Sequence, residues 1–546
     1  MTFRVYLTLA VAALLAIVAV PHSSPAAEGD AAAVMAHHAR YVGNPAGLVL
    51  RYRWEREASA TPPPTPPPDE ADIPKSGAPE TLIYRRGALY HELGSSNGYS
   101  SESGFTGRAF WSADDNGYTV VLLEDQARFA LTDNALDSDQ LGNAALLSRG
   151  TRTVNGVACD IVRVTPPSGM TAEVAVDQTT GAFVHVTYDP DDRYRHDEET
   201  IVGYKEIAPG VRVPAAFKWG RGEFKLVDAS VIEVTNEQLR GPVPTPKWTF
   251  ASTDTAPIDL VTHTPQYGFL PPGKTVYVHA TINGTPGTFL LDSGDGADIL
   301  LYSSFTDKLT KKLAVVGRTG FSGINGRGVG ARLARVDALM VGKNTLSNVI
   351  VAVAKGGFPG GIDGILGYDF LAGALVDVNL ADRTIRILDP SAYEPTVAKG
   401  AYAFPVNLAT RQPGISLRIG SVTTKAVFDS GDDFLVSLSD DLTRTGRVVA
   451  LTDSARITDP FSGAPMEFQY NLTFMGVDGP MSVPAKCSRI NQLEIGPYRY
   501  TRVETCFASA EVFGKDGGLI GMDFLQHFNW TFDYADAKVV LTPNGL

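Results

Sequence analysis

The chain of 546 residues contains only three cysteines and nine histidines. No His-Glu-x-x-His segment is present to bind zinc. Three scattered cysteines cannot form a disulfide scaffold. Any chemistry must therefore come from other side chains.

Basic residues and long apolar runs are also scarce. The chain has 47 lysines and arginines against 60 aspartates and glutamates, giving a formal net charge of −13, and it has no dense basic tract. A nucleic-acid partner needs a basic face for the phosphate backbone, so the composition argues against such a partner. After the N-terminus, no segment is long and apolar enough to predict a membrane-spanning helix.

The N-terminus has the composition of an export signal. Arg4 precedes an apolar run over residues 5–20, and small residues follow at 24–27. This run is shorter than the ~20 residues of a spanning helix. We interpret residues 1–27 as a cleaved secretory signal peptide, the alternative being an uncleaved anchor. The signal predicts a secreted protein, located in the bacterial periplasm.

Glycine and proline are plentiful, with 54 and 35 residues, which favours many short strands and turns. The length exceeds what one hydrophobic core normally holds. We expect a β-rich accessory domain over 28–250 with a proline-rich loop at 61–79. A linker over 251–267 should follow, and then two lobes over 268–395 and 396–546.

The C-terminal half contains a diverged internal repeat. ATINGTPGTFLLDSGDGADILL (280–301) aligns without a gap with LRIGSVTTKAVFDSGDDFLVSL (417–438). A second pair of segments also matches, namely DGILGYDFLAGALVDVNLADRTIRIL (363–388) and GGLIGMDFLQHFNWTFDYADAKVVL (517–541). Each unit has an apolar strand running into Asp-Ser-Gly-Asp, and later two apolar residues, a glycine and Asp-Phe-Leu. Two such units predict two lobes related by a pseudo-two-fold axis.

These motifs resemble one lobe of a retropepsin-like aspartic protease, and two of them in one chain are similar to the bilobal arrangement of pepsin. The resemblance covers residues 268–546, about half of the chain. It implies a mainly β fold with two acid-protease barrels, here preceded by an antiparallel curved-sheet domain. It also implies an aspartic-type endopeptidase that hydrolyses peptide or protein substrates.

The resemblance assigns the chemistry to Asp292 and Asp429. Two carboxylates about 3 Å apart cannot both be ionised, so they share one proton. One carboxylate acts as a general base on a water molecule, and the protonated partner donates to the scissile carbonyl. This mechanism requires neither a metal nor a cofactor, and we expect none.

Residues next to the two aspartates should support them. The resemblance suggests that Ser293 and Ser430 bridge the lobes beneath the dyad. Gly294 and Gly431 would let backbone amides approach the carboxylates, where a side chain would intrude.

The motif also implies two glycines, Gly367 and Gly521, that let a strand cross close to the catalytic loop. A flap that covers the substrate is expected in the glycine-rich segment 319–336. An ordinary surface hairpin would have the same composition. The residues expected to contact substrate there are Gly323, Ile324, Asn325 and Gly326.

Both units depart from the family pattern directly after Asp-Ser-Gly. The family has alanine, serine or threonine there, whereas this chain has Asp295 and Asp432, with Asp433 beside the latter. An additional acid should raise the proton affinity of the dyad, and it could disfavour acidic substrates or spoil catalysis. Two alternatives stay open: Ca²⁺ binding by the acidic loops, and a non-catalytic, protease-derived module that binds peptides or lipoprotein segments.

The N-terminal region consists of strand and turn patterns, among them GRAFWSADDNG (107–117), AEVAVDQTTGAFVHV (172–186) and YKEIAPGVRVPAAF (204–217). These segments resemble the curved-sheet domains of periplasmic lipoprotein carriers over roughly residues 45–250. The resemblance implies contact with a lipid or lipoprotein, and the alternative is an accessory domain without a ligand.

The remaining predictions concern single residues. Cys487 and Cys506 flank a predicted hairpin and could pair in an oxidising compartment, which would leave Cys159 as a small buried residue. His37 and His38 are neighbours on a predicted helix, point apart, and should lie on a solvated face. We expect the protein to be a monomer.

Overall fold

The structure is a computed structural model of the chain. It describes residues 28–545 apart from 46, 57–78, 97, 139–140, 192–196, 221, 243–246, 264–272, 297–298, 323–327, 358–360, 393–398, 452–456, 459–464, 467–469, 477–478, 510–512 and 514–516. The predicted signal peptide and most of the proline-rich loop therefore lie outside the described residues. Within the described part of the chain, no helix has the length and apolar character needed to cross a membrane.

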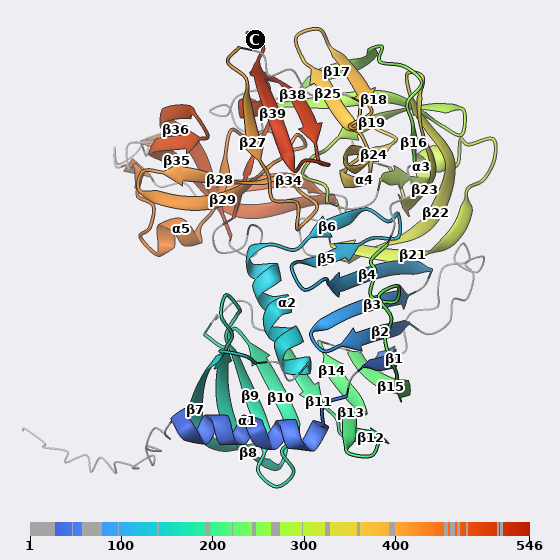
Figure 1. The fold of residues 1–546 in the computed structure, drawn as a ribbon. Coiled ribbons are helices and arrows are strands. Elements are labelled where there is room, and N and C mark those ends of the chain that lie inside the picture. Colours follow the sequence, from blue (N-terminus) through green and yellow to red (C-terminus); the bar gives the residue numbers. More distant parts are fainter. Residues whose placement is uncertain are drawn as a thin grey trace, which may run out of the picture. The chain divides into compact units, whose positions relative to one another are not determined.

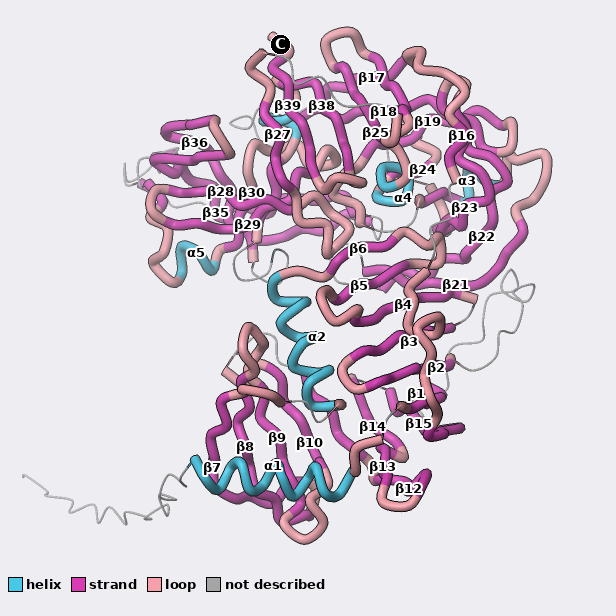
Figure 2. The backbone as a smooth tube through the Cα atoms, viewed as in Figure 1, coloured by secondary structure: helices cyan, strands magenta, loops and turns pink. Residues whose placement is uncertain are grey.

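β-Strands make up most of the described chain (Figure 2), so the mainly β fold class predicted from the sequence is confirmed. The chain divides into two compact units. One unit comprises Met1–Asn44 and Ala135–Gly220, and the other comprises Pro45–Asn134 and Arg221–Leu546. The domain boundaries predicted from the sequence remain predictions.

The first unit is a sheet with one long helix. Helix α1 (Glu28–Val42) lies across β7, β8 and β9 (Figure 1). The strands follow the order β14-β11-β10-β9-β8-β7, and β12 pairs separately with β13. Their bounds are β7 (Ala145–Val154), β8 (Val157–Thr165), β9 (Ala172–Asp177), β10 (Phe183–Tyr188), β11 (Asp197–Ile201), β12 (Tyr204–Ala208), β13 (Val211–Pro214) and β14 (Ala216–Trp219).

The helix packs against this sheet through a histidine that the sequence analysis placed in solvent. His38 is 3% exposed, and its ring stacks on Phe183 with 3.4 Å between centroids. Its Nδ1 lies 2.9 Å from the carbonyl oxygen of Gly181. Burial lowers the pKa of His38 to about 4. The prediction of a solvated face is therefore wrong for His38, whereas Cys159 is free and buried as predicted.

The second unit begins with its own antiparallel sheet, in the order β6-β5-β4-β3-β2-β1-β15. The strands are β1 (Leu48–Arg56), β2 (Glu80–Arg86), β3 (Leu89–Ser96), β4 (Tyr99–Phe105), β5 (Phe110–Ala113), β6 (Thr119–Val121) and β15 (Gly222–Val231). Helix α2 (Glu124–Asp137) follows β6 in the chain. We call β1 to β6 with β15 the N-terminal sheet.

The two sequence repeats occupy the rest of the second unit. The first contains β16 (Trp248–Thr249), β17 (Ala256–His263), β18 (Gly273–Ile282), β19 (Thr285–Leu291), β20 (Leu300–Tyr302), α3 (Ser303–Thr306), β21 (Ala314–Ser322), β22 (Gly328–Val341), β23 (Asn344–Ala354), β24 (Gly364–Leu366), α4 (Tyr368–Ala372), β25 (Leu375–Asn379) and β26 (Thr384–Leu388). The second contains β27 (Tyr402–Pro405), β28 (Gly414–Ile419), β29 (Val422–Phe428), β30 (Ser437–Ser439), α5 (Asp441–Arg444), β31 (Ala450–Leu451), β32 (Ile457–Thr458), β33 (Pro465–Met466), β34 (Tyr470–Gly476), β35 (Gly479–Ile495), β36 (Tyr498–Ala508), β37 (Gly518–Ile520), α7 (Met522–Leu525), β38 (Phe528–Asp533) and β39 (Lys538–Pro543).

The strand pairing repeats from one half to the other. In the first repeat β19 pairs with β18 and runs parallel to β24, which is antiparallel to β20. In the second, β29 pairs with β28 and runs parallel to β37, which is antiparallel to β30. The repeats also share one sheet, because β25 pairs antiparallel with β38. Each aligned sequence segment thus forms the same set of strands.

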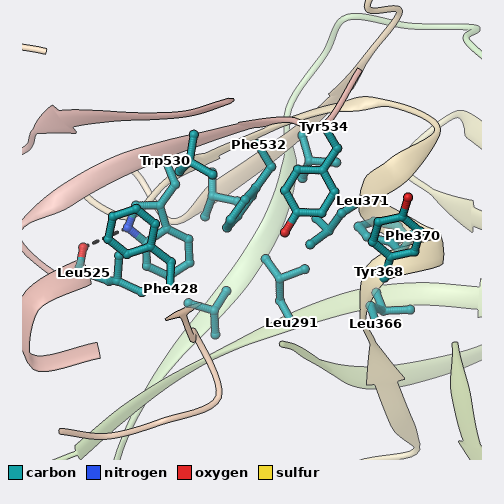
Figure 3. Close-up of a cluster of buried hydrophobic side chains, with 14 of the residues drawn as sticks. Leu291, Leu366, Tyr368, Phe370, Leu371, Phe428, Leu525, Trp530, Phe532 and Tyr534 are labelled. Carbon is teal, nitrogen blue, oxygen red and sulfur yellow. Dashed lines mark hydrogen bonds between the residues drawn. The ribbon is translucent and has the colours of Figure 1, made fainter. Parts of the chain in front are cut away.

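An apolar core continues from one repeat into the other beneath this shared sheet. Leu291 and Phe428, the last residues of β19 and β29, are fully buried in a single cluster with Trp530, Phe532 and Tyr534 (Figure 3). The indole nitrogen of Trp530 donates to the carbonyl of Leu525 at 2.8 Å, which satisfies the only polar atom of that buried side chain. The strand ends that precede the two aspartates are therefore fixed in a common core.

The predicted hairpin near the C-terminus is present and carries a disulfide. β35 and β36 pair antiparallel, with Cys487 directly opposite Cys506. The two sulfurs are bonded, and the Cα atoms are 4.0 Å apart.

Candidate active site

Asp292 and Asp429 occupy equivalent backbone positions. Each follows a buried strand, and each backbone amide donates to the last residue of the parallel neighbour strand. Asp292 donates to Leu366 at 3.1 Å, and Asp429 donates to Ile520 at 2.9 Å. Since the flanking strands pack in one core, both carboxyl groups project from fixed backbone at the same level.

Ser293 and Ser430 join the two repeats directly below these aspartates. The hydroxyl of Ser293 donates to the carbonyl of Phe428, and the hydroxyl of Ser430 donates to the carbonyl of Leu291, both at 2.8 Å. Each hydroxyl also accepts the other serine's backbone amide, at 3.0 and 3.1 Å. Both serines are at most 1% exposed. The result is a closed set of four hydrogen bonds across the pseudo-two-fold axis.

The following glycines bring the carboxyl groups together. The amide of Gly294 donates to Asp292 at 2.9 Å, and the amide of Gly431 donates to Asp429 at 2.8 Å. A Cβ at Gly294 would lie 2.3 Å from Cγ of Asp429, and one at Gly431 would lie 2.7 Å from Cγ of Asp292. Each carboxyl group therefore lies against the glycine of the opposite repeat, and the two carboxyl groups hydrogen-bond to each other.

The two carboxyl groups differ in their proton affinity. Burial raises the pKa of Asp292 well above its usual range, and the negative charges of Asp429 and Asp295 raise it further. Burial also raises the pKa of Asp429, but the hydrogen bond from Asp292 and the amide of Gly431 oppose that effect. Asp292 therefore holds the shared proton, and Asp429 is the ionised carboxylate of the pair.

Gly367 and Gly521 lie where the motif predicts a close crossing. A Cβ at Gly367 would come within 2.7 Å of the carbonyl oxygen of Asp295, and one at Gly521 within 2.5 Å of the carbonyl oxygen of Asp432. The next residue uses the same carbonyl: Tyr368 donates its amide to Asp295 at 3.0 Å, and the equivalent bond to Asp432 measures 2.7 Å. Any larger residue would push α4 or α7 off the aspartate loop.

The additional acids lie beside the dyad. Asp432 is 8% exposed, and burial together with the charges of Asp429 and Asp433 raises its pKa well above the usual range. Asp433 packs against Gly273, whose Cβ would lie 2.2 Å from its Cγ. Among the described residues, no group of three or more acids, histidines or cysteines is arranged to hold a metal ion. Asp295 adds its negative charge beside Asp292, whereas burial favours the neutral, protonated form of Asp432.

The predicted flap residues Gly323, Ile324, Asn325 and Gly326 lie outside the described residues, so the flap remains a prediction.

Residues 268–275 (GFLPPGKT) fit the spacing of a phosphate-binding loop, although the sequence was expected to contain none. Such a loop must lead into a helix, whereas Gly273 begins the strand β18.

Sequence reasoning missed residues that contact the aspartate loops from elsewhere in the chain. The side-chain amide of Gln412 donates to the carbonyl oxygen of Gly294. Tyr534 is buried, and its pKa is raised well above the usual range by burial, by Tyr368 and by the charge of Asp292. Gln412 belongs to no motif, and the effect of Asp292 on Tyr534 does not follow from the position of Tyr534 in the repeat.

Comparison with known proteins gives a partial match. Residues 278–370, which cover most of the first repeat, match the family model described as aspartyl protease. This region is aspartyl protease-like. None of the curated proteins matches the chain.

Three solved structures are similar to the N-terminal part of the chain. A DUF1329 family protein from Desulfovibrio piger is 12% identical, with a TM-score of 0.27, over 38% of this chain and 97% of its own. A putative outer membrane lipoprotein-sorting protein domain from Vibrio parahaemolyticus is 8% identical, with a TM-score of 0.29, over 39% and 97%. A LolA superfamily protein from Nitrosomonas europaea is 9% identical, with a TM-score of 0.29, over 38% and 97%.

Proposed function

We propose that the two repeats form an aspartic endopeptidase with Asp292 and Asp429 as its catalytic dyad. The observation that carries the proposal is the reciprocal joining of the two Asp-Ser-Gly loops. Four hydrogen bonds that Ser293 and Ser430 make across the two repeats hold the loops together, and each carboxyl group lies against the opposite glycine. A binding module would not need two carboxylates that compete for one proton.

The proposed reaction follows from the difference in proton affinity. Asp429 removes a proton from a water molecule while the oxygen attacks the scissile carbonyl carbon. Asp292 donates its proton to the carbonyl oxygen, which gives a neutral tetrahedral diol. The proton held by Asp429 then passes to the amide nitrogen as the carbon–nitrogen bond breaks. A diol hydroxyl returns its proton to Asp292, so the dyad again holds one proton.

The substrate class and location are part of the same proposal. We expect an extended peptide segment as substrate, and the negative charge of Asp295 disfavours acidic residues next to the scissile bond. The disulfide in the β35–β36 hairpin supports the predicted export, because such bonds persist in oxidising compartments such as the periplasm.

The test is cleavage of an unstructured protein between pH 3 and 8, with and without a statine-type transition-state analogue. We expect cleavage that the analogue blocks, and a loss of about 10²–10⁴-fold in kcat for Asp292→Asn and for Asp429→Asn. Asp254→Asn is the matched control, because Asp254 is an exposed carboxylate in the same unit and pairs only with Ser252 and Lys343 at the surface.

The second candidate is a non-catalytic module that binds peptides or lipoprotein segments. The acid that directly follows each Asp-Ser-Gly motif favours it, since excess negative charge can hold both dyad protons in place. Intact substrate at every pH, together with retained binding of the analogue, would establish this candidate and exclude the enzyme.

A further inference from the structure

One turn of the N-terminal sheet makes its side-chain contacts with the first repeat. The turn Asp114–Tyr118 joins β5 to β6, and Asn116 at its tip is 5% exposed. The Asn116 amide donates to the carbonyl of Ile350 at 2.9 Å and to Asp369 at 2.5 Å. Its oxygen accepts the Ile350 amide at 2.9 Å and Lys247 at 2.7 Å. Asn116 thus satisfies backbone groups of β23 as a neighbouring strand would.

The same turn supplies a buried anion for a cation of the second repeat. Asp114 is 7% exposed, and one of its oxygens accepts the amides of Asn116 and Tyr118 at 3.0 Å each. The other oxygen lies 3.4 Å from Nε of Arg411. The guanidinium of Arg411 lies over the ring of Tyr368, 5.8 Å from its centroid, and Tyr118 meets that ring edge-on. Arg411 is therefore held between the turn and the first residue of α4.

Arg411 belongs to a short segment that supports the first aspartate loop. This segment, residues 407–412, lies between β27 and β28. Gln412 donates to the carbonyl of Gly294, and a Cβ at Gly296 would lie 2.6 Å from the carbonyl oxygen of Thr410. Arg411 itself has φ +59°, a left-handed conformation that costs free energy for a non-glycine residue. Contacts of its side chain must maintain that conformation.

We infer that Asp114 and Arg411 are positioning residues of the proposed protease, because their ion pair holds residues 407–412 against the loop that carries Asp292. The N-terminal sheet then contributes to the active site without touching the substrate. Among the described residues this support reaches the first repeat: Asp369 contacts Asn116, whereas its counterpart Asp523 contacts Gln526, the residue directly after its own short helix. The inference rests on the proposed function for its kinetic part, and on geometry alone for its structural part.

The experiment compares Asp114→Asn, Arg411→Gln, the double variant and the conservative Arg411→Lys with the control Asp254→Asn in the full chain. Two readouts are used well below the melting temperature. One is kcat and KM on an unstructured protein substrate. The other is amide hydrogen exchange in peptides that cover residues 290–296 and 406–413, with β18 and β19 as internal reference.

We expect Asp114→Asn and Arg411→Gln each to lower kcat about tenfold with little change in KM. Exchange at 290–296 and 406–413 should become about tenfold faster, with the reference strands unchanged. The double variant should lose no more than either single variant, since both remove one interaction. Arg411→Lys should recover part of kcat, and Asp254→Asn should match wild type.

Unchanged exchange at both segments in Asp114→Asn and Arg411→Gln would overturn the inference, as would a lower melting temperature with unaltered kcat. If Asp114→Asn fails to fold, Arg411→Gln and Arg411→Lys decide the question alone. If wild type cleaves nothing, the proposed function fails, but the exchange measurements still test the positioning role.

Discussion

At the residue scale, the hydrogen bonds of the two buried serines join the two aspartate loops into one site. Each hydroxyl donates once and accepts once across the repeats, so removing one leaves both a carbonyl and an amide without a partner. We predict that Ser293→Ala destabilises the protein by about 1–3 kcal/mol, because burying an unpaired polar group costs that much. Urea unfolding measures the change.

A matched serine tests whether burial and bridging cause this loss. Ser391 lies in an exposed turn, where its hydroxyl bonds only Asp389 two positions earlier. Ser391→Ala should change the unfolding free energy by less than about 0.5 kcal/mol. Equal effects at Ser293 and Ser391 would contradict the bridging role.

Asp295 should set the alkaline limit of activity. Its negative charge is one of the causes that raise the pKa of Asp292. Replacing it with asparagine removes that charge, which lowers the pKa of Asp292. The dyad then loses its shared proton at lower pH, so the alkaline limb of the kcat/KM profile should move down by about one pH unit. A limb that stays in place or moves upward would refute this effect.

At the element scale, the β35–β36 hairpin depends on its disulfide. The bond closes a loop with a sequence separation of 19 residues, and a loop of this length is worth about 3 kcal/mol in the chain-entropy model. We predict that replacing Cys487 and Cys506 with serine lowers the unfolding free energy by about that amount. Dithiothreitol should lower the unfolding free energy of wild type by the same amount and leave the double variant unchanged. A loss of stability in the double variant with dithiothreitol would show that the effect does not come from this disulfide.

Strands and dyad neighbours were predictable from the sequence because they follow repeating rules. Apolar runs that end in Asp-Ser-Gly occur twice, and the second copy removed the ambiguity of the first. The burial of His38 was not predictable, since it depends on the position of Phe183 in a distant strand. The same holds for Arg411, whose partner Asp114 lies in a turn of the N-terminal sheet that is distant in sequence. Periodicity within a segment carries no information on such contacts.

At the scale of the whole molecule, buried carboxyl groups should make stability fall as pH rises. Burial and the charge of Asp114, opposed by Lys247 and Arg411, raise the pKa of Asp115 from an ordinary value of 3.8 to about 6. Burial also raises the pKa of Asp114, Asp292 and Asp432. The folded chain therefore binds these protons more tightly than the unfolded chain. For Asp115, the stabilising contribution is complete below about pH 4 and is lost as pH rises through 6.

Asp115 allows this argument to be tested away from the dyad. Asp115→Asn removes a group that must ionise in a buried place. The unfolding free energy of the variant should therefore rise relative to that of wild type between pH 4 and 7. The gain should reach on the order of 2–3 kcal/mol, the free-energy equivalent of the change in pKa. Urea unfolding at several pH values measures, for wild type and variant, the slope of the unfolding free energy against pH. Ser391→Ala, which changes no charge, should keep the wild-type slope. If Asp115→Asn also keeps that slope, the carboxylate of Asp115 is not buried in the folded protein. The burial of the turn that holds the Asp114–Arg411 ion pair would then be contradicted.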